Sequence, residues 1–93
     1  LQEAVNAIGQ GRGTIRIAPG TYRQCAVQEA GVIVYEAPEP GSVTFTARSC
    51  EGKAAFVLRG IGAEIRGITF SNLRVADGNG AGIRLEKGAL NVA

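Results

Sequence analysis

Residues 1–17 read LQEAVNAIGQGRGTIRI, and the spacing of their apolar side chains changes halfway through. The first half places its apolar residues at the i, i+3, i+4 and i+7 positions of one helix face, namely Leu1, Ala4, Val5 and Ile8. Gly9 follows them, as is typical of a helix end. From Thr14 the period becomes two, with Ile15 and Ile17 on one side. The stretch predicts a short helix over residues 1–9 and a strand after it.

The rest of the chain predicts short strands and no further helix. Its 14 glycines and its aromatic content of 5% suit many strands with tight turns. Strands are expected in seven segments, the fifth bent at Gly67: 22–27, 32–35, 43–46, 54–58, 65–70, 83–86 and 90–92. A β-sandwich of hairpins is the alternative, but the short hairpin signals Asn-Gly and Asp-Gly occur only between Asp77 and Gly80.

A weak internal repeat favours stacked parallel strands over hairpins. Val43-Thr44-Phe45 resembles Ile68-Thr69-Phe70 at a spacing of 25 residues, and Leu90-Asn91-Val92 follows Ile68 after 22. A series of first strands is expected through Ile15, Ile33, Phe56 and Ile83. The fold class is therefore all-β, a parallel β-helix or solenoid of about three to four rungs that rise about 4.8 Å each. One segment spans residues 1–93, with the capping helix over 1–9 and the rungs over 14–93.

The two ends of this stack have different requirements. A solenoid end exposes unpaired backbone and open core, so the helix is expected to lie over the first rung as a lid. The strand at Leu90–Ala93 has no lid, and its edge is expected to pair with a continuation of the same β-helix. Both ends of the sequence fall inside structural patterns, which predicts a piece cut from a longer protein.

Charge and composition argue against several function classes. The chain has 10 basic and 8 acidic side chains, a net charge of +2, which is too balanced to imply nucleic acid or a membrane surface. The absence of histidine rules out Ser–His and Cys–His catalysis, and two cysteines alone are too few for a metal site. The glycines at 9, 11 and 13 lie between a helix and a strand, the reverse of a dinucleotide loop, so no cofactor is expected.

Cys25 and Cys50 are separated by 25 residues, about one rung. Neighbouring rungs could bring them close enough to bond, although the strands do not place them in register. The alternative is two free buried thiols. A disulfide is favoured, and it would stabilise the fold by roughly 3–4 kcal/mol in the chain-entropy model. It also points to an oxidising location, either secreted or periplasmic.

Three arginines are the candidate substrate-binding residues. Arg16, Arg66 and Arg84 each follow an isoleucine and should point outward, where a row of guanidinium groups could bind the carboxylates of an acidic polysaccharide. The alternative, which the sequence favours, is a solvated face of mixed charge neutralised by Glu64 and Glu86.

Other polar residues have weaker functional interpretations. Glycosidases need two carboxylates at a set separation, and the candidates are Glu36, Glu39 and Glu51, although loop solubility explains them better. Asp77 and Asn79 could bind calcium, but a turn is the commoner role. Tyr22 and Tyr35 could stack on sugar rings, against the commoner role of a buried ring edge with a wet hydroxyl.

Three segments of the chain resemble the pectin lyase-like β-helix proteins. They are the opening helix, the stretch Gly13-Thr14-Ile15-Arg16-Ile17-Ala18-Pro19-Gly20-Thr21-Tyr22 and the stretch Ile65-Arg66-Gly67-Ile68-Thr69-Phe70-Ser71-Asn72. In that family a capping helix, a strand and a Pro-Gly-Thr-Tyr turn precede the rungs, and Asn72 would occupy a tight turn. The resemblance implies a right-handed β-helix and a secreted, carbohydrate-acting protein whose catalytic residues lie on later rungs. No residue here matches a catalytic motif of the family. Alternatives are a non-catalytic surface or adhesion scaffold and, more weakly, a lectin-like sandwich.

Overall fold

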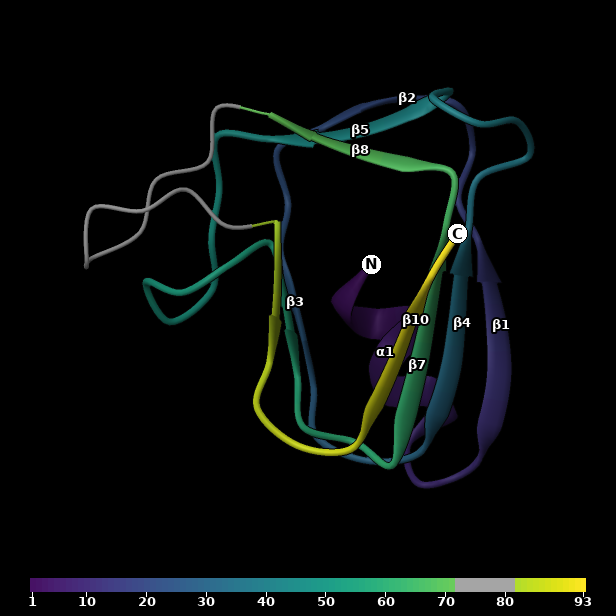
Figure 1. Cartoon of the computed structure of the whole chain (residues 1–93), viewed down its shortest axis with the longest axis vertical. Coiled ribbons are helices and arrows are strands. Elements are labelled where there is room, and N and C mark those ends of the chain that lie inside the picture. The colour runs from purple at the N-terminus through teal and green to yellow at the C-terminus, as the bar shows by residue number, and fades with distance from the viewer. Residues whose placement is uncertain (72–81) are drawn as a thin grey trace.

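The computed structural model of the chain describes residues 1–71 and 82–93, which form one α-helix and ten β-strands (Figure 1). The elements are α1 (Gln2–Ile8), β1 (Arg12–Arg16), β2 (Gly20–Tyr22), β3 (Ala26–Gln28), β4 (Val32–Glu36), β5 (Val43–Thr46), β6 (Phe56–Leu58), β7 (Gly62–Arg66), β8 (Ile68–Ser71), β9 (Ile83–Leu85) and β10 (Ala89–Val92). Asn72 and the Asp77–Gly80 turn signal lie outside the described residues.

The strands form three parallel sheets, and each strand pairs with the strand three places later in the chain. The first sheet has the order β1-β4-β7-β10, the second β2-β5-β8 and the third β3-β6-β9. Figure 1 shows these sheets as three walls around a common interior. The described residues therefore make three passes through the walls, over residues 12–28, over 32–58, and over 62–71 with 82–85, and β10 begins a fourth. Every strand pairing among the described residues is parallel, so the predicted all-β class is confirmed and the hairpin sandwich is wrong for them.

Apolar side chains from all three walls fill the interior. Tyr35, Phe45 and Phe56 are fully buried, as are Ile33, Val43, Leu58 and Ile65. An aromatic ladder runs along the second sheet, where the ring of Phe45 stacks on Tyr22 at 5.4 Å and on Phe70 at 6.3 Å between ring centroids. Phe56 meets Phe45 edge-on at 5.0 Å, which joins the second wall to the third. Each pass therefore contributes to one continuous core.

The internal repeat is confirmed in one place and wrong in others. Val43-Thr44-Phe45 lies in register against Ile68-Thr69-Phe70 in the second sheet, as the 25-residue spacing predicts. The predicted series of first strands is wrong, because Ile15 lies opposite Tyr35 while Phe56 and Ile83 pair with each other in the third sheet. Leu90-Asn91-Val92 belongs to the first sheet and not beneath β8. The strands of the first sheet begin at residues 12, 32, 62 and 89, so no constant period could have located them.

Two predicted strands are each divided between two walls. The segment 22–27 does not form one strand, because β2 ends at Tyr22, β3 begins at Ala26, and three residues between them turn the corner. The bend at Gly67 is confirmed, since this residue separates β7 from β8 with a φ of 68°. A side chain there would place its Cβ 3.2 Å from the Cα of Pro40. Glycine suits the corner both for its left-handed backbone and for this close approach.

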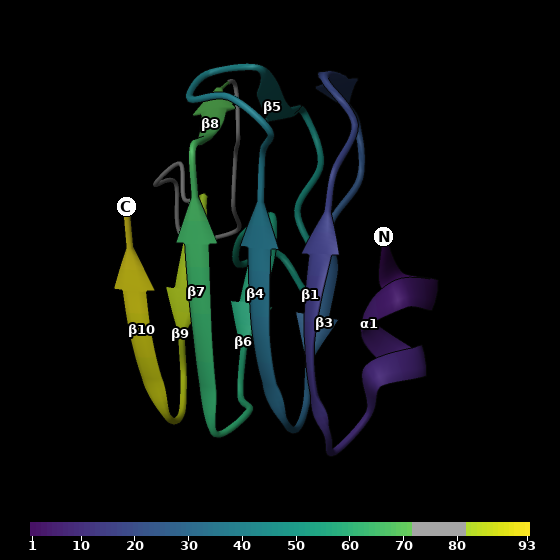
Figure 2. The ribbon, with the colours of Figure 1, turned by 90° about the vertical axis from the view of Figure 1, so that its right-hand side faces the viewer.

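The helix lies across the first-pass end of the interior. It packs against β1 and β3, and its central residue, Val5, is 4% exposed. Gly9, with a φ of 58°, ends the helix. Figure 2 shows α1 beside β1, on the side opposite to β10. The position agrees with the predicted lid, because the apolar face of the helix covers core that the first pass would otherwise leave open.

No described residue covers the opposite end of the interior. Val92 and Leu85 are 60% and 43% exposed, although their sheet partners Ile65 and Leu58 are buried. Because paired residues in a sheet point the same way, Val92 and Leu85 face the interior axis, and none of the described residues lies beyond them. The two ends therefore differ in their described residues, one closed by a helix and one open.

Candidate functional site

Two of the three predicted binding arginines lie on the same outer face of the first sheet. Arg16 on β1 and Arg66 on β7 flank Glu36 on the intervening strand β4, in one row of register partners. The Nε of Arg16 lies 2.9 Å from a Glu36 oxygen, and Nη1 of Arg66 lies 4.0 Å from the other oxygen. Arg66 makes a closer ion pair of 2.6 Å with Glu64. The charges in this row therefore alternate, and the Glu36 carboxylate lies between the guanidinium groups of Arg16 and Arg66.

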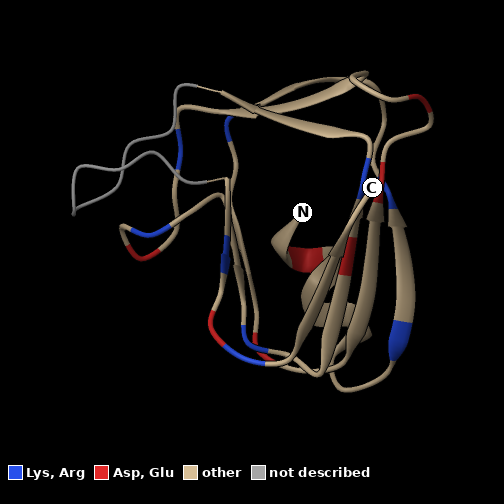
Figure 3. Cartoon of the chain, viewed as in Figure 1, with Lys and Arg blue, Asp and Glu red and all other residues tan. Residues whose placement is uncertain are grey.

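Arg84 is not part of this row. It lies on β9 in the third sheet, opposite Val57, and its Nε is 3.6 Å from Glu86. The structure therefore brings Arg16 and Arg66 together and leaves Arg84 on another wall. The predicted neutralisation by Glu64 and Glu86 is confirmed by their ion pairs with Arg66 and Arg84. Figure 3 shows Lys and Arg positions interleaved with Asp and Glu positions along the described part of the chain.

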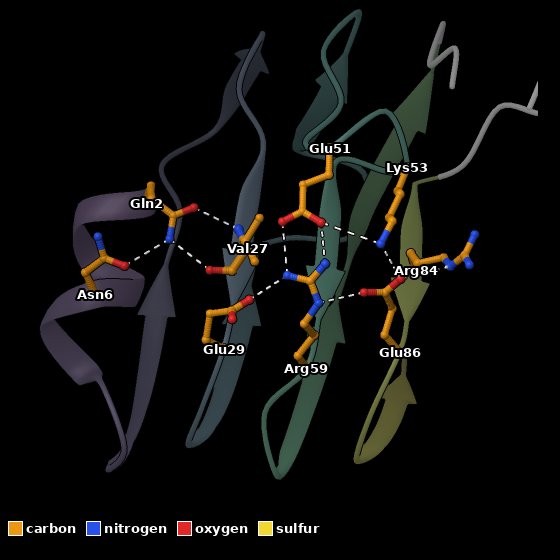
Figure 4. Close-up of polar contacts among 9 residues, drawn as sticks. All are labelled: Gln2, Asn6, Val27, Glu29, Glu51, Lys53, Arg59, Arg84 and Glu86. Carbon is orange, nitrogen blue, oxygen red and sulfur yellow. Dashed lines mark hydrogen bonds and ion pairs between the residues drawn. The ribbon is translucent and has the colours of Figure 1, made fainter. Parts of the chain in front are cut away.

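Among the described residues, Arg59 has the most ion-pair partners, and sequence reasoning missed it. It follows β6, and its guanidinium group contacts Glu29 at 2.6 Å, Glu86 at 2.6 Å and Glu51 by a bidentate pair (Figure 4). Lys53 closes the network at 2.7 Å from Glu86 and 3.5 Å from Glu51. Glu29, Arg59 and Glu86 follow β3, β6 and β9, so this arginine links all three passes of the third sheet. We call these five residues the Arg59 cluster.

Mutual attraction shifts the titration of the Arg59 cluster. The hydrogen bond from Arg59 lowers the pKa of Glu51, and the hydrogen bonds from Lys53 and Arg59 lower the pKa of Glu86. Hydrogen bonds to Glu51, Glu29 and Glu86, in that order of effect, raise the pKa of Arg59. Glu51 and Glu86 are therefore held ionised, and a carboxylate with a lowered pKa is a poor proton donor near neutral pH. The chemistry of the cluster is that of a cross-link rather than of an acid–base catalyst.

The predicted disulfide is confirmed. Cys25 and Cys50 are bonded, with their Cα atoms 5.5 Å apart. Cys25 lies in the corner between β2 and β3, and Cys50 lies in the connection between β5 and β6. The bond therefore joins the first pass to the second at one corner. Glu51, next to Cys50, is bound by Arg59, so the covalent link and the Arg59 cluster hold the same connection.

A side-chain amide completes the outer edge of the third sheet. Gln2 on α1 accepts a hydrogen bond from the backbone N–H of Val27 at 2.8 Å and donates one to the carbonyl of Val27 at 2.9 Å (Figure 4). Gln2 also donates to Asn6 at 3.0 Å. The amide thus makes the two bonds that a neighbouring strand would make to β3. This Gln2 clamp satisfies an edge that would otherwise be free to pair.

A second amide, that of Gln28, lies wholly inside the core. It is 1% exposed, accepts a hydrogen bond of 2.7 Å from the Tyr35 hydroxyl, and its Nε2 lies 3.0–3.2 Å from the carbonyl oxygens of Ala30, Gly31 and Gly62. Burial raises the pKa of the Tyr35 phenol. Tyr35 therefore cannot stack on a sugar ring, and its predicted wet hydroxyl is wrong because Gln28 replaces water as the acceptor. Tyr22 is half-buried and donates to the carbonyl of Ala18 at 2.6 Å.

The remaining candidates do not assemble into a reactive group. Glu36 ends β4, Glu39 lies in the connection to β5, and Glu51 lies in the connection to β6. Glu36 is ion-paired with Arg16, and Glu51 is ion-paired with Arg59. Asp77 and Asn79 lie outside the described residues. Within residues 1–71 and 82–93 no group of three His, Cys, Asp or Glu side chains is placed to hold a metal ion. No helix in this part of the chain has the length and apolar character needed to span a membrane.

The sequence carried only faint signals for the residues it missed. Gln2, Gln28 and Arg59 each contact at least one partner that is 25 to 34 residues away, and these long-range contacts exist only in the observed register. Comparisons of the chain with protein-family models, with curated proteins and with solved structures find no match. Function must therefore be argued from the arrangement of the molecule itself.

Proposed function

We propose that this chain is the closed starting end of a right-handed parallel β-helix, and that it acts as the scaffold on which further passes of a secreted carbohydrate-acting protein stack. The supporting observation is the contrast between the two ends of the three parallel sheets. At one end α1 and the Gln2 clamp cover the core and satisfy the edge of β3. At the other end Val92 and Leu85 face the axis without a cover among the described residues. Parallel crossover connections are almost always right-handed, which supports the proposed hand.

The open end has the features of a surface prepared for another pass. In parallel pairing, alternate residues of a strand bond to the same neighbour: Ala89 donates to the carbonyl of Ile61, just before β7, at 3.1 Å, and Ala93, just after β10, donates to the carbonyl of Ile65 at 2.9 Å. Leu90 and Val92 then direct their backbone groups to the open side. Their apolar side chains continue the columns of buried Ala63 and Ile65. A further parallel strand would both form hydrogen bonds with these backbone groups and bury the side chain of Val92.

A scaffold role is also consistent with the charged groups. The candidate arginines Arg16, Arg66 and Arg84 are each ion-paired, and neighbouring cations lower the pKa of Glu51 and of Glu86 in the Arg59 cluster. Catalytic residues would then belong to later passes. The carbohydrate assignment rests on the resemblance of the opening stretch to pectin lyase-like proteins, and the disulfide supports an oxidising, secreted or periplasmic location. A non-catalytic adhesion scaffold is the alternative with the same architecture.

The test compares the 93-residue chain with a form extended beyond Ala93 by one further pass. The short chain should turn over neither pectate nor alginate, and its Leu90 and Val92 amides should exchange rapidly with solvent. In the longer form the same two amides should become protected by at least tenfold. Turnover by the short chain would refute the scaffold role, and unchanged exchange in the longer form would refute the stacking of a further pass.

A further inference from the structure

The helix leaves part of the first-pass end open on the side of β2. It packs against β1 and β3, and Figure 1 shows it displaced from β2. A hollow of about 240 Å³ remains there, lined mainly by apolar groups of Leu1, Ala4, Ile15, Ile17, Tyr22 and Phe45 and bordered by Gln24 and by Arg16, which is ion-paired with Glu36. A second hollow of about 370 Å³ adjoins it, because Leu1 and Gln24 line both. We call the pair the cap-end hollows.

The second hollow has an excess of unpaired positive charge. Arg23 and Arg48 line it, and neither makes an ion pair with any described residue. The arginines expected to bind substrate, by contrast, are all paired. Glu3 also lines the hollow, so two guanidinium groups face one carboxylate there. Gln24 lies between the hollows, where its Oε1 accepts a bond of 3.2 Å from the amino group of Leu1.

The disulfide explains why these two like charges occupy one hollow. Arg23 and Arg48 each precede a bonded cysteine by two residues, although they come from different passes. The bond fixes the two Cα atoms of Cys25 and Cys50 at 5.5 Å, and so holds both segments at the same corner. The single carboxylate of Glu3 offsets only one of the two guanidinium charges, and an anion placed between them would offset the other. Guanidinium groups bind carboxylate and sulfate oxygens in a bidentate manner.

We propose that the cap-end hollows bind an acidic glycan. A carboxylate or sulfate of the glycan lies between Arg23 and Arg48, and the adjoining sugar ring covers the apolar hollow beside Ile17 and Tyr22. Concave sites with an apolar lining and a few convergent polar groups are the usual form of small-ligand sites. The proposal rests on the carbohydrate part of the proposed function, but the site belongs to the capped end and is independent of any further pass. It replaces the paired Arg16, Arg66 and Arg84 as the anion-binding group.

The experiment is titration calorimetry of the chain at low ionic strength with short chains of polygalacturonate, dextran sulfate and neutral dextran. Binding of both anionic probes would assign the site to anionic sugars in general, and binding of polygalacturonate alone would assign it to carboxylates. Neutral dextran should not bind. The double variant Arg23→Gln, Arg48→Gln should lose at least tenfold in affinity, because it removes two charge-assisted contacts.

A matched control separates this site from general attraction to a basic protein. The variant Arg12→Gln, Lys87→Gln removes the same charge from two residues that line neither hollow and have no ion pair among the described residues. Its affinity should stay within about twofold of the parent, and the melting temperatures of both variants should agree with it. Equal losses in the two variants, or no binding by the parent, would overturn the proposal. So would dimerisation abolished by the Arg23, Arg48 variant, since a second copy would then occupy the hollows. None of these outcomes bears on exchange at β10, which tests the scaffold separately.

Discussion

Removing the disulfide should be the most destabilising change that leaves the core intact. The double variant Cys25→Ala, Cys50→Ala opens a loop with a sequence separation of 25 residues. In the chain-entropy model, closing a loop of this length lowers the entropy of the unfolded chain by about 12 cal/mol/K, or about 3.5 kcal/mol at 25 °C. Native stabilities of small domains are typically about 5–15 kcal/mol, so the loss is a large fraction of the total.

The structure adds a local reason to expect the full effect. Ala47 and Glu51 adopt left-handed backbone with φ of 62° and 56°, a conformation that non-glycine residues rarely adopt. The bond at Cys50 holds the connection that contains both residues, and a bridge to Ala54 closes its end. Without the bond, the contacts of Glu51 with Arg59 and Lys53 must hold this connection. We therefore expect it to relax.

The measurement is urea unfolding with parallel thermal melts, with and without reductant. At about 4–8 °C per kcal/mol, the loss corresponds to a fall in melting temperature of roughly 14–28 °C. The parent protein in reductant should melt close to the double variant, and reductant should not change the variant itself. Equal melting temperatures for the parent with and without reductant would show that the bond contributes nothing, and the reasoning would be wrong.

Two further predictions concern the contacts that the structure revealed. Gln2→Ala should lower the free energy of unfolding by about 1–2 kcal/mol, because two part-buried hydrogen bonds to Val27 are lost. The control Asn6→Ala, on the same helix, should change the free energy of unfolding by no more than about 0.5 kcal/mol. Equal urea midpoints for the two variants would refute the clamp. Acid should weaken the Arg59 cluster: the folded-state pKa of Glu51 and of Glu86 is lowered below the ordinary 4.5, so their contribution is present above that pH and is lost as pH falls through the folded values. Arg59→Gln should therefore reduce the fall in melting temperature between pH 7 and pH 3, and an unchanged fall would count against the cluster.

Local periodicity was enough to predict the elements at the start of the chain. The four apolar residues of one helix face and Gly9 located α1, and the alternation after Thr14 located β1. These patterns depend on neighbours within one turn of helix or two residues of strand, so no tertiary information is needed. The Val-Thr-Phe and Ile-Thr-Phe match worked for a related reason. The aromatic ladder requires Phe45 and Phe70 at the same position of the second wall.

The assignment of strands to walls could not be read in the same way. All three walls send apolar side chains into one core, so a short apolar strand fits any of them. Phe56 and Ile15 look equivalent in sequence, yet they lie in the third and first sheets. The lengths of the connections decide which wall each strand joins. These lengths vary because the connections contain different structures, and the one before β6, for example, contains the disulfide-bonded Cys50. The Arg59 cluster was hidden for the same reason, since its members meet only after the walls are assigned.

The alternating charges explain how a core of interchangeable apolar residues keeps its register. Sliding a strand by two residues leaves its apolar side chains facing the core, so hydrophobic burial alone discriminates weakly against such a slip. The same slip would remove Arg59 from Glu29 and Glu86 on the third wall, and Glu36 from Arg16 and Arg66 on the first. Exposed ion pairs are individually weak, but a row in which each charge has neighbours of opposite sign changes as a unit when one strand moves. Specifying register, in addition to a small gain in stability, is therefore the role that best accounts for the placement of these charges at the ends of strands in two different walls.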